Sequence, residues 1–300
     1  MSTWSRLSWL LLLGSLLPGA ALSQEGGASA SDPASSAVVW CLDRERDVVR
    51  RDLPSQCHGS IVSDAEARAV KARREEAIAH ALAPKADNGV QGLNFASLGT
   101  AFYVDEAGDL ITNDHVVANC RVVQVRSLEQ PPVSATVLAV DQMHDLALLH
   151  AGPSSPGYAT FRSGVHAGIS SNVSTVGYPD EGLPALEPQA SQGKLLRGDD
   201  GAGHMLIDMD VRHGNSGSPL LDTGGLVIGV IRAKVNSPAV YARTGHEVDD
   251  TGVAIPTSSV LEFLAHNHIH FYASNGAPSE DQHGLLSAAR KFVARAECWK

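Results

Sequence analysis

The sequence predicts an all-β protein, and three observations support this prediction. Short runs rich in β-branched and apolar residues recur from about Leu93 onward, separated by turn residues. Glycine is plentiful, with 28 residues, and aromatic residues make up only 5% of the chain, as expected of a fold with many tight turns. Strand patterns do not alternate with helical ones, so a doubly wound α/β sheet is disfavoured. An antiparallel sandwich or barrel fits this pattern best.

The composition fits one or two ordinary globular domains and argues against some partners. The chain has 300 residues, of which 43% are hydrophobic and 19% charged, so a sizeable core can form. The formal net charge is −10, whereas nucleic-acid binding needs a basic surface. We therefore expect no nucleic-acid partner, and an acidic protein is also repelled by anionic membrane surfaces.

Residues 1–23 have the organisation of a signal peptide. Arg6 is the only charge in this stretch, residues 7–17 are largely apolar, and Ala21-Leu22-Ser23 offers small residues for cleavage after Ser23. The apolar run is shorter than the about 20 residues that span a bilayer. We expect residues 1–23 to be removed on export, which leaves no membrane anchor and makes the protein periplasmic or secreted.

The next segments form a linker and a small module with two of the four cysteines. Residues 24–37, mostly Gly, Ala and Ser, predict a flexible linker. Residues 38–61 alternate apolar and polar side chains and predict a two-cysteine hairpin module. Four cysteines in an exported chain indicate disulfides with three possible pairings, of which Cys41–Cys57 with Cys120–Cys298 is the simplest. A zinc site is the weaker alternative, because ligands at the usual spacing are missing around these cysteines.

Three helices are predicted beside the strands. Ser63 and Glu66 form a capping box that opens a connecting helix over 62–84, for which partner binding is the alternative role. A short helix is expected over 257–265. The helix predicted over 279–297 makes residues 271–300 a C-terminal helical extension; its apolar face consists of Leu285, Ala289, Phe292 and Val293.

The β-rich runs fall within residues 93–270, which we interpret as the main domain. They lie at 99–105, 110–114, 120–128, 133–141, 145–151, 173–179, 193–198, 204–210, 218–222 and 226–235.

The run HGNSGSPLLD, residues 213–222, makes Ser216 either a nucleophile or part of a tight turn. A nucleophile needs a base, an orienting acid and an oxyanion site from elsewhere in the chain. Among 13 histidines, His115 follows an apolar strand and a turn, whereas His150 suits a strand end and His213 is too close to Ser216. His266, His268 and His270 alternate, so a strand there would have either a metal site or a plain exposed face.

Two acids compete for the orienting role. Asp141 ends a β-rich run and is typical of a turn, whereas Asp145 directly precedes the apolar run Leu-Ala-Leu-Leu. The orienting acid must be desolvated yet hydrogen-bonded, because it fixes the histidine tautomer and stabilises the imidazolium. Asp145 fits this role better.

Three segments in the order His, Asp, Ser carry a family resemblance: GTAFYVDEAGDLITNDHVV, DQMHDLALL and GNSGSPLLD. They resemble the trypsin-like, chymotrypsin-fold serine proteases, most closely the protease domain of the bacterial HtrA/DegP family. The resemblance covers about residues 95–268, with further matches at Val176-Gly177-Tyr178-Pro179, Gly193, 224–230 and Val253-Ala254-Ile255-Pro256. It implies two six-stranded antiparallel β-barrels, catalytic residues His115, Asp145 and Ser216 in the cleft between them, and an oxyanion hole formed by the N–H groups of Gly214 and Ser216.

The resemblance implies an exported serine endopeptidase that cleaves protein or peptide substrates through an acyl-enzyme, without a metal or organic cofactor. The alternatives are a catalytically inactive, protease-like binding protein and a hydrolase of non-peptide substrates. An α/β-hydrolase is disfavoured, because its elbow needs Gly where this chain has Ser218 and its triad order is the reverse.

The chain departs from the family in several places. HtrA proteins have a PDZ domain after the protease domain, and the residues after 268 are too few for one, so we expect a monomer. His213 and Ser218 stand where the family commonly has Pro and Gly. Asp210 lies six residues before Ser216, where an acid gives trypsin-like enzymes a preference for Lys or Arg, and is therefore a candidate substrate-binding residue.

Overall fold

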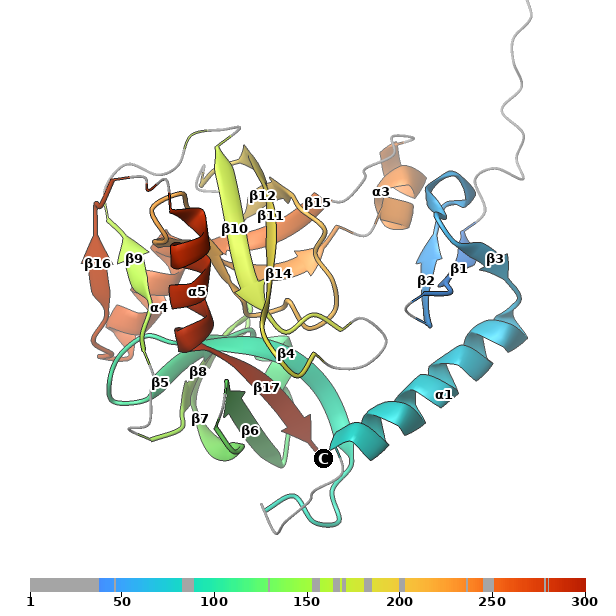
Figure 1. The fold of residues 1–300 in the computed structure, drawn as a ribbon, viewed down its shortest axis with the longest axis horizontal. Coiled ribbons are helices and arrows are strands. Elements are labelled where there is room, and N and C mark those ends of the chain that lie inside the picture. The colour runs from blue at the N-terminus through green and yellow to red at the C-terminus, as the bar shows by residue number, and fades with distance from the viewer. Residues whose placement is uncertain are drawn as a thin grey trace, which may run out of the picture.

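The computed structural model describes residues 38–300 except residues 46, 83–88, 129, 153–156, 164–167, 169–170, 181–184, 200–202, 236, 245–250, 278 and 280. The predicted signal peptide (1–23) and linker (24–37) lie outside the described residues. The chain forms two β-barrels, with a small N-terminal module beside them (Figure 1).

The first barrel is closed by six strands in the order β17-β4-β5-β8-β7-β6. Its strands are β4 (Phe95–Tyr103), β5 (Asp109–Thr112), β6 (Val122–Ser127), β7 (Val133–Asp141), β8 (Leu146–His150) and β17 (Val293–Trp299). All neighbouring strands in it are antiparallel. The last strand of the chain therefore completes the barrel that β4 begins.

The second barrel is closed by six further strands, because β13 pairs with both β10 and β14. Its strands are β10 (Asn172–Gly177), β11 (Gln189–Arg197), β12 (Met205–Asp208), β13 (Pro219–Leu221), β14 (Val227–Lys234) and β15 (Thr251–Pro256). Two short strands, β9 (Thr160–Arg162) and β16 (Tyr272–Ser274), extend the sheet beyond β14 in parallel. The prediction of an all-β protein with two six-stranded barrels is confirmed.

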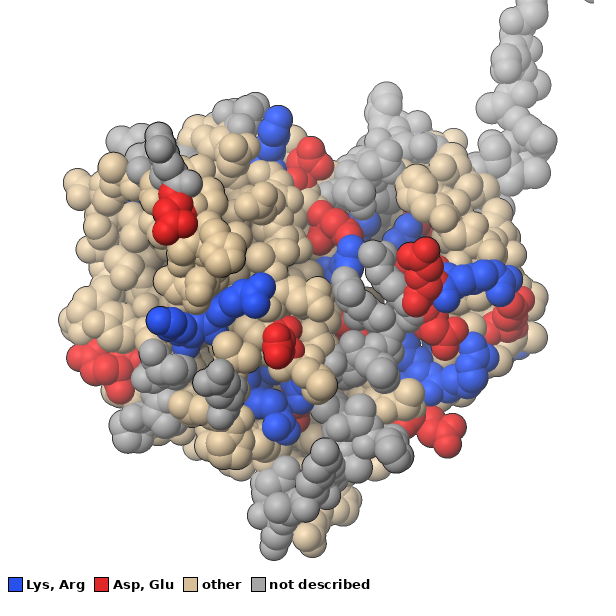
Figure 2. Space-filling model, viewed as in Figure 1, with Lys and Arg blue, Asp and Glu red and all other residues tan. Residues whose placement is uncertain are grey.

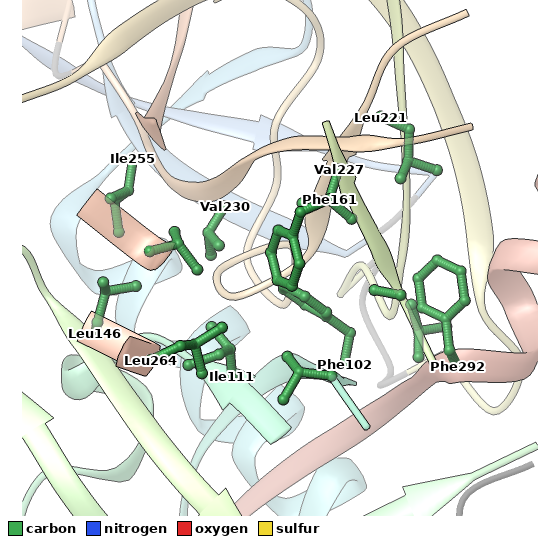
Figure 3. Close-up of a cluster of buried hydrophobic side chains, with 14 of the residues drawn as sticks. Phe102, Ile111, Leu146, Phe161, Leu221, Val227, Val230, Ile255, Leu264 and Phe292 are labelled. Atoms are coloured by element: carbon green, nitrogen blue, oxygen red, sulfur yellow. The ribbon is translucent and has the colours of Figure 1, made fainter. Parts of the chain in front are cut away.

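Strand alternation separates the barrel interiors from the contact between the barrels. Along β4, Ala101 and Tyr103 point into the first barrel, whereas Phe102 joins an apolar cluster with residues of the second. Figure 3 shows this cluster, in which Phe102 packs against Phe161 with ring centroids 6.2 Å apart. Both rings are fully buried, and each such burial stabilises the fold by about 1.5 to 3 kcal/mol.

The C-terminal segment differs from the predicted helical extension over 271–300. Helix α5 (Gln282–Phe292) ends before Val293, and the following residues form β17 rather than continuing the predicted helix to 297. Ala294 and Ala296 face the interior of the first barrel, and β17 pairs with β4 on one side and β6 on the other. The pairing partners decide the conformation here, because they override the helical propensity of alanine, arginine and glutamate. The first barrel therefore extends beyond the predicted domain boundary at 270.

The N-terminal module is a three-stranded sheet rather than a hairpin alone. Strand β1 (Val39–Asp43) pairs with β2 (Val48–Asp52) and with β3 (Ser60–Val62), and a short 3-10 helix, η2 (Pro54–Gln56), lies between β2 and β3. Helix α1 (Asp64–Leu82) follows the sheet. Ser63 Oγ accepts a hydrogen bond from Glu66 N (3.2 Å), as a helix N-cap requires.

The remaining helices are short. They are α2 (Asp114–Val117), α3 (Ser237–Thr244) and α4 (Thr257–His266), the last of which matches the helix predicted over 257–265. No helix in the described residues is both long and apolar enough to cross a bilayer.

Candidate active site

The loop that contains Ser216 is held between the two barrels. The main-chain oxygen of Ser216 accepts a hydrogen bond from Thr100 N of β4 (2.8 Å), and Gly217 N donates to Ile231 O of β14 (2.8 Å). Gly217 has a φ of +86°, and a Cβ there would lie 2.0 Å from Thr100 O. Glycine alone permits this close approach, so the loop is fixed to one strand of each barrel.

His115 and Asp145 belong to the first barrel and are hydrogen-bonded to each other. His115 lies in α2, and Asp145 directly precedes β8. His115 Nδ1 is 2.8 Å from Asp145 Oδ2 and 3.0 Å from Oδ1, which also accepts from the His115 main-chain N–H (3.0 Å). Asp145 adopts an uncommon φ of +58°, and Asn113 Nδ2 donates to its main-chain oxygen (2.8 Å). These contacts hold the carboxylate and the imidazole in one relative orientation.

The Asp145 carboxylate is buried but ionised. Burial by itself raises its pKa, but hydrogen bonds from the His115 side chain and main chain, the charge of His115 and a hydrogen bond from Arg232 outweigh burial and lower the pKa. Arg232 Nε lies 3.1 Å from Asp145 Oδ2. An ionised carboxylate is the form that orients a histidine N–H and stabilises an imidazolium.

Ser216 and His115 are neighbours without a hydrogen bond between their side chains. The Ser216 hydroxyl donates to Arg232 O at 3.1 Å. Their segments meet at Gly99 of β4. A Cβ on Gly99 would lie within 3.0 Å of both Ser216 O and the side chain of Val116, the residue that follows His115. A serine hydroxyl moves between staggered χ1 positions at low cost, and hydrogen bonds at catalytic sites often tighten only when substrate is bound.

The turn before Ser216 leaves two main-chain N–H groups without an acceptor. Gly214 has a φ of +85°, and a Cβ there would lie 2.1 Å from Tyr178 O. Thr100 Oγ1 donates to Gly214 O (2.7 Å) and accepts from Tyr178 N (2.9 Å), which fixes the turn. In the part of the chain that the structure describes, the N–H groups of Gly214 and Ser216 have no acceptor. Two preorganised N–H donors beside a serine suit a developing oxyanion.

The competing acids and bases are engaged elsewhere. Asp141 Oδ2 lies 2.6 Å from His144 Nδ1, and Asp109 Oδ1 lies 2.7 Å from His150 Nδ1. The His213 side chain is exposed in the loop, although the residue contributes its main-chain oxygen to a hydrogen bond from Asp180 N.

Asp210 is paired within its own loop. Its carboxylate is exposed and accepts a hydrogen bond from Arg212 Nε at 2.7 Å. The predicted substrate-binding carboxylate therefore already has a cationic partner.

The three alternating histidines do not share a strand face. His266 ends α4, His268 adopts a φ of +59° in the following turn, and the His270 ring packs edge-on against Tyr272. No metal-binding cluster of His, Cys, Asp or Glu occurs among the residues with described positions.

The cysteines form two disulfides. Cys41 is bonded to Cys57 in the N-terminal module, and Cys120 to Cys298, with Cα atoms 5.5 and 5.3 Å apart. Cys120 follows α2, and Cys298 belongs to β17. The second bridge therefore ties the closing strand of the first barrel to the segment that contains His115.

Three residues of this arrangement could not be selected from the sequence. Thr100 lies in a strand and holds the Ser216 loop through both its main-chain N–H and its hydroxyl. Arg232 is a charged residue near a strand end, where a solvent-exposed side chain is the ordinary expectation. Asn113 had the clearest signal, because it stands two residues before His115 in a turn.

Comparison with known proteins agrees with this arrangement. The family model described as trypsin-like peptidase domain matches residues 99–230. The chain is 31% identical over 207 residues to the uncharacterized protein y4bJ of Sinorhizobium fredii, which is 68% of this chain and 32% of that protein. It is 29% identical to the serine protease HTR4 of Rattus norvegicus over 58% of this chain and 34% of the relative.

A bacterial relative and a solved structure complete the comparison. The chain is 30% identical to the probable periplasmic serine endoprotease DegP-like of Chlamydia pneumoniae, over 50% of this chain and 31% of the relative. The serine endoprotease from Yersinia pestis superposes with a TM-score of 0.49 at 20% identity, covering 57% of each chain. The chain spans about a third of the length of these curated relatives. Residues 99–230 are a trypsin-like peptidase domain, with sequence similarity to the HtrA/DegP serine proteases.

Proposed function

We propose that the protein is a serine endopeptidase that acts on protein or peptide substrates. The observation that supports this most is the hydrogen-bonded pair His115–Asp145 beside Ser216, whose loop leaves two N–H groups without acceptors. A trypsin-like domain with similarity to HtrA proteases supports the same chemistry. Its nucleophile, base, orienting acid and oxyanion donors would all lie between the two barrels.

In the proposed mechanism, Ser216 is the nucleophile and His115 the general base. The Ser216 hydroxyl would leave Arg232 O by rotation about χ1, transfer its proton to His115 Nε2 and attack the peptide carbonyl. Asp145 would hold the His115 ring and stabilise the imidazolium, and the N–H groups of Gly214 and Ser216 would bind the oxyanion. His115 would then protonate the leaving amine, and water would hydrolyse the acyl-enzyme.

The structure gives little support for a basic substrate preference through Asp210. A carboxylate that is exposed and already paired with Arg212 attracts a second cation weakly. From the sequence, we also propose that the protein is exported and monomeric. Its similarity to a probable periplasmic serine endoprotease supports export.

An organophosphonate probe tests the proposed function. Such probes phosphonylate an activated serine, so we expect the wild-type protein to be labelled and Ser216→Ala not to be. Labelling is read by mass spectrometry, with circular dichroism to show that both proteins are folded. A folded wild type that is neither labelled nor able to digest casein would instead favour the protease-like binding protein.

Arg232 is proposed as a positioning residue with an electrostatic role. Its guanidinium binds Asp145 and brings a positive charge near the imidazolium that forms during turnover. Arg232→Gln removes this charge and a hydrogen bond that lowers the pKa of Asp145, so the acid limb of the kcat/KM profile should move to higher pH by about 0.5 to 1 unit.

Matched variants separate this effect from a general change of charge. Lys194→Gln removes one positive charge from an exposed site on β11 and should leave the pH profile unchanged. Arg232→Lys retains the charge and should leave the acid limb of the kcat/KM profile close to its wild-type position. Identical pH profiles for Arg232→Gln and the wild type would contradict the electrostatic role.

A further inference from the structure

The N-terminal module and helix α1, which follows it, contact the protease domain next to the active-site loop. Arg74 of α1 forms an ion pair with Asp180, a residue 106 positions later in the chain. The side chains are only 19% and 10% exposed, so water and salt screen this pair less than they screen a typical surface ion pair. It joins an element outside the two barrels to the segment after β10.

The main chain of Asp180 is hydrogen-bonded to the turn that contains Gly214. Asp180 N donates to His213 O at 2.7 Å. A Cβ on Gly214 would lie 2.1 Å from Tyr178 O and 3.2 Å from Asp180 N, so the two segments are in contact along this stretch. A shift of the segment from Tyr178 to Asp180 would therefore move the Gly214 N–H.

The module has a second contact on the same side of the domain. Strand β2 packs against α3, which lies between β14 and β15 of the second barrel. Figure 1 shows α3 beside β2, and α1 running from the module back toward the first barrel. Figure 2 shows that charged side chains gather over the module and α1 on this face, whereas much of the second barrel is uncharged. Two contacts, Arg74–Asp180 and β2–α3, thus hold the module and α1 on the domain.

We propose that the N-terminal module, together with helix α1, is a positioning element for the oxyanion hole, with Arg74 of α1 as the residue that transmits its effect. This inference rests on the proposed function, because it assigns the module a role in the same reaction. The module fixes Asp180 through Arg74, Asp180 fixes His213, and His213 fixes the orientation of the Gly214 N–H. The protease domain without the docked module would retain Ser216, His115 and Asp145 but would stabilise the oxyanion poorly.

The central test compares Arg74→Gln with Arg73→Gln. Arg73 is adjacent on α1 but pairs with Asp47 inside the module (2.9 Å), with both side chains more than half exposed. Loss of a complete oxyanion donor lowers kcat by about 10²- to 10³-fold, and a displaced donor should cost less. We expect Arg74→Gln to lower kcat by about 10- to 100-fold with little change in KM, and Arg73→Gln to match the wild type.

A second readout does not depend on catalysis. Amide hydrogen exchange, followed by mass spectrometry, should become faster in residues 213–216 of Arg74→Gln and stay unchanged in Arg73→Gln. An inactive wild type would refute the protease proposal, whereas this measurement would still test the coupling. Equal exchange and equal kcat in the two variants would overturn the inference.

A charge swap keeps the test informative if Arg74→Gln is poorly folded. Arg74→Asp combined with Asp180→Arg restores the ion pair with reversed polarity. We expect the double variant to have a higher kcat, and slower amide hydrogen exchange in residues 213–216, than either single variant. A double variant as impaired as the single ones would show that the ion pair does not position the loop.

Discussion

Replacing Ser216 with Ala is expected to lower kcat/KM for peptide hydrolysis by at least about 10⁴-fold, because only binding and the oxyanion donors would remain. The fold should persist, since the Ser216 hydroxyl makes a single hydrogen bond to Arg232 O. Its loss should change the free energy of unfolding by about 1 kcal/mol or less. Steady-state hydrolysis of a peptide substrate and urea unfolding of both proteins measure the two effects.

Ser218→Ala is the matched control for this variant. Ser218 lies two residues away in the same loop, is fully buried, and its Oγ has no hydrogen-bond partner among the described residues. Removing an unsatisfied buried hydroxyl is neutral or stabilising, so activity should stay close to that of the wild type. Comparable activity losses in Ser216→Ala and Ser218→Ala would indicate that both changes act through the packing of the loop, and would contradict the role of Ser216 as the nucleophile.

Loss of the Cys120–Cys298 disulfide is expected to be the largest change in stability. The bridge closes a loop of 178 residues, and the chain-entropy model assigns such a loop about 5 kcal/mol. The Cys41–Cys57 bridge closes a loop of 16 residues, for which the same model gives about 3 kcal/mol. Urea unfolding of Cys120→Ser/Cys298→Ser and Cys41→Ser/Cys57→Ser measures both losses.

The two disulfides should also differ in their effect on the active site. Helix α2, which contains His115, packs against β17, and Cys298 holds β17 to the residue three positions after α2. Loosening β17 should disturb the His115–Asp145 pair, so the variant without Cys120 and Cys298 should lose most phosphonate labelling at urea concentrations below its unfolding midpoint, before the fold is lost. Labelling that falls only in step with global unfolding would contradict this effect on the active site. A smaller stability loss than that of the Cys41→Ser/Cys57→Ser variant would contradict the greater stabilisation assigned to the longer loop.

The positions of the strands and of the Ser216 neighbours follow closely from the sequence. The apolar runs with turn residues between them predict most strands of both barrels, because strand alternation and tight turns are local properties. The structure also places His115 against Asp145 rather than Asp141, as expected for an acid at the start of a buried strand.

Long-range contacts explain what sequence patterns missed. Strand β17 has the composition of a helix, and its Arg295 and Glu297 are fully buried in contact with each other (Nε–Oε1, 2.8 Å). Only the strands on both sides and this buried pair make the segment extended. The roles of Arg74 and Arg232 depend in the same way on partners 106 and 87 positions away, which no local pattern contains.

The closing strand of the first barrel also determines when the protein can fold. Val293 pairs with Phe102 and Trp299 with Val122, so these pairings join residues made early to residues made much later. Contacts of such high sequence separation form slowly, because the loop-closure entropy must be overcome first. A ribosome-bound chain that has not yet reached residue 293 contains all three residues of the proposed triad but only five strands of the first barrel. The complete barrel, and with it the aligned histidine and aspartate, therefore forms only after translation has passed this strand.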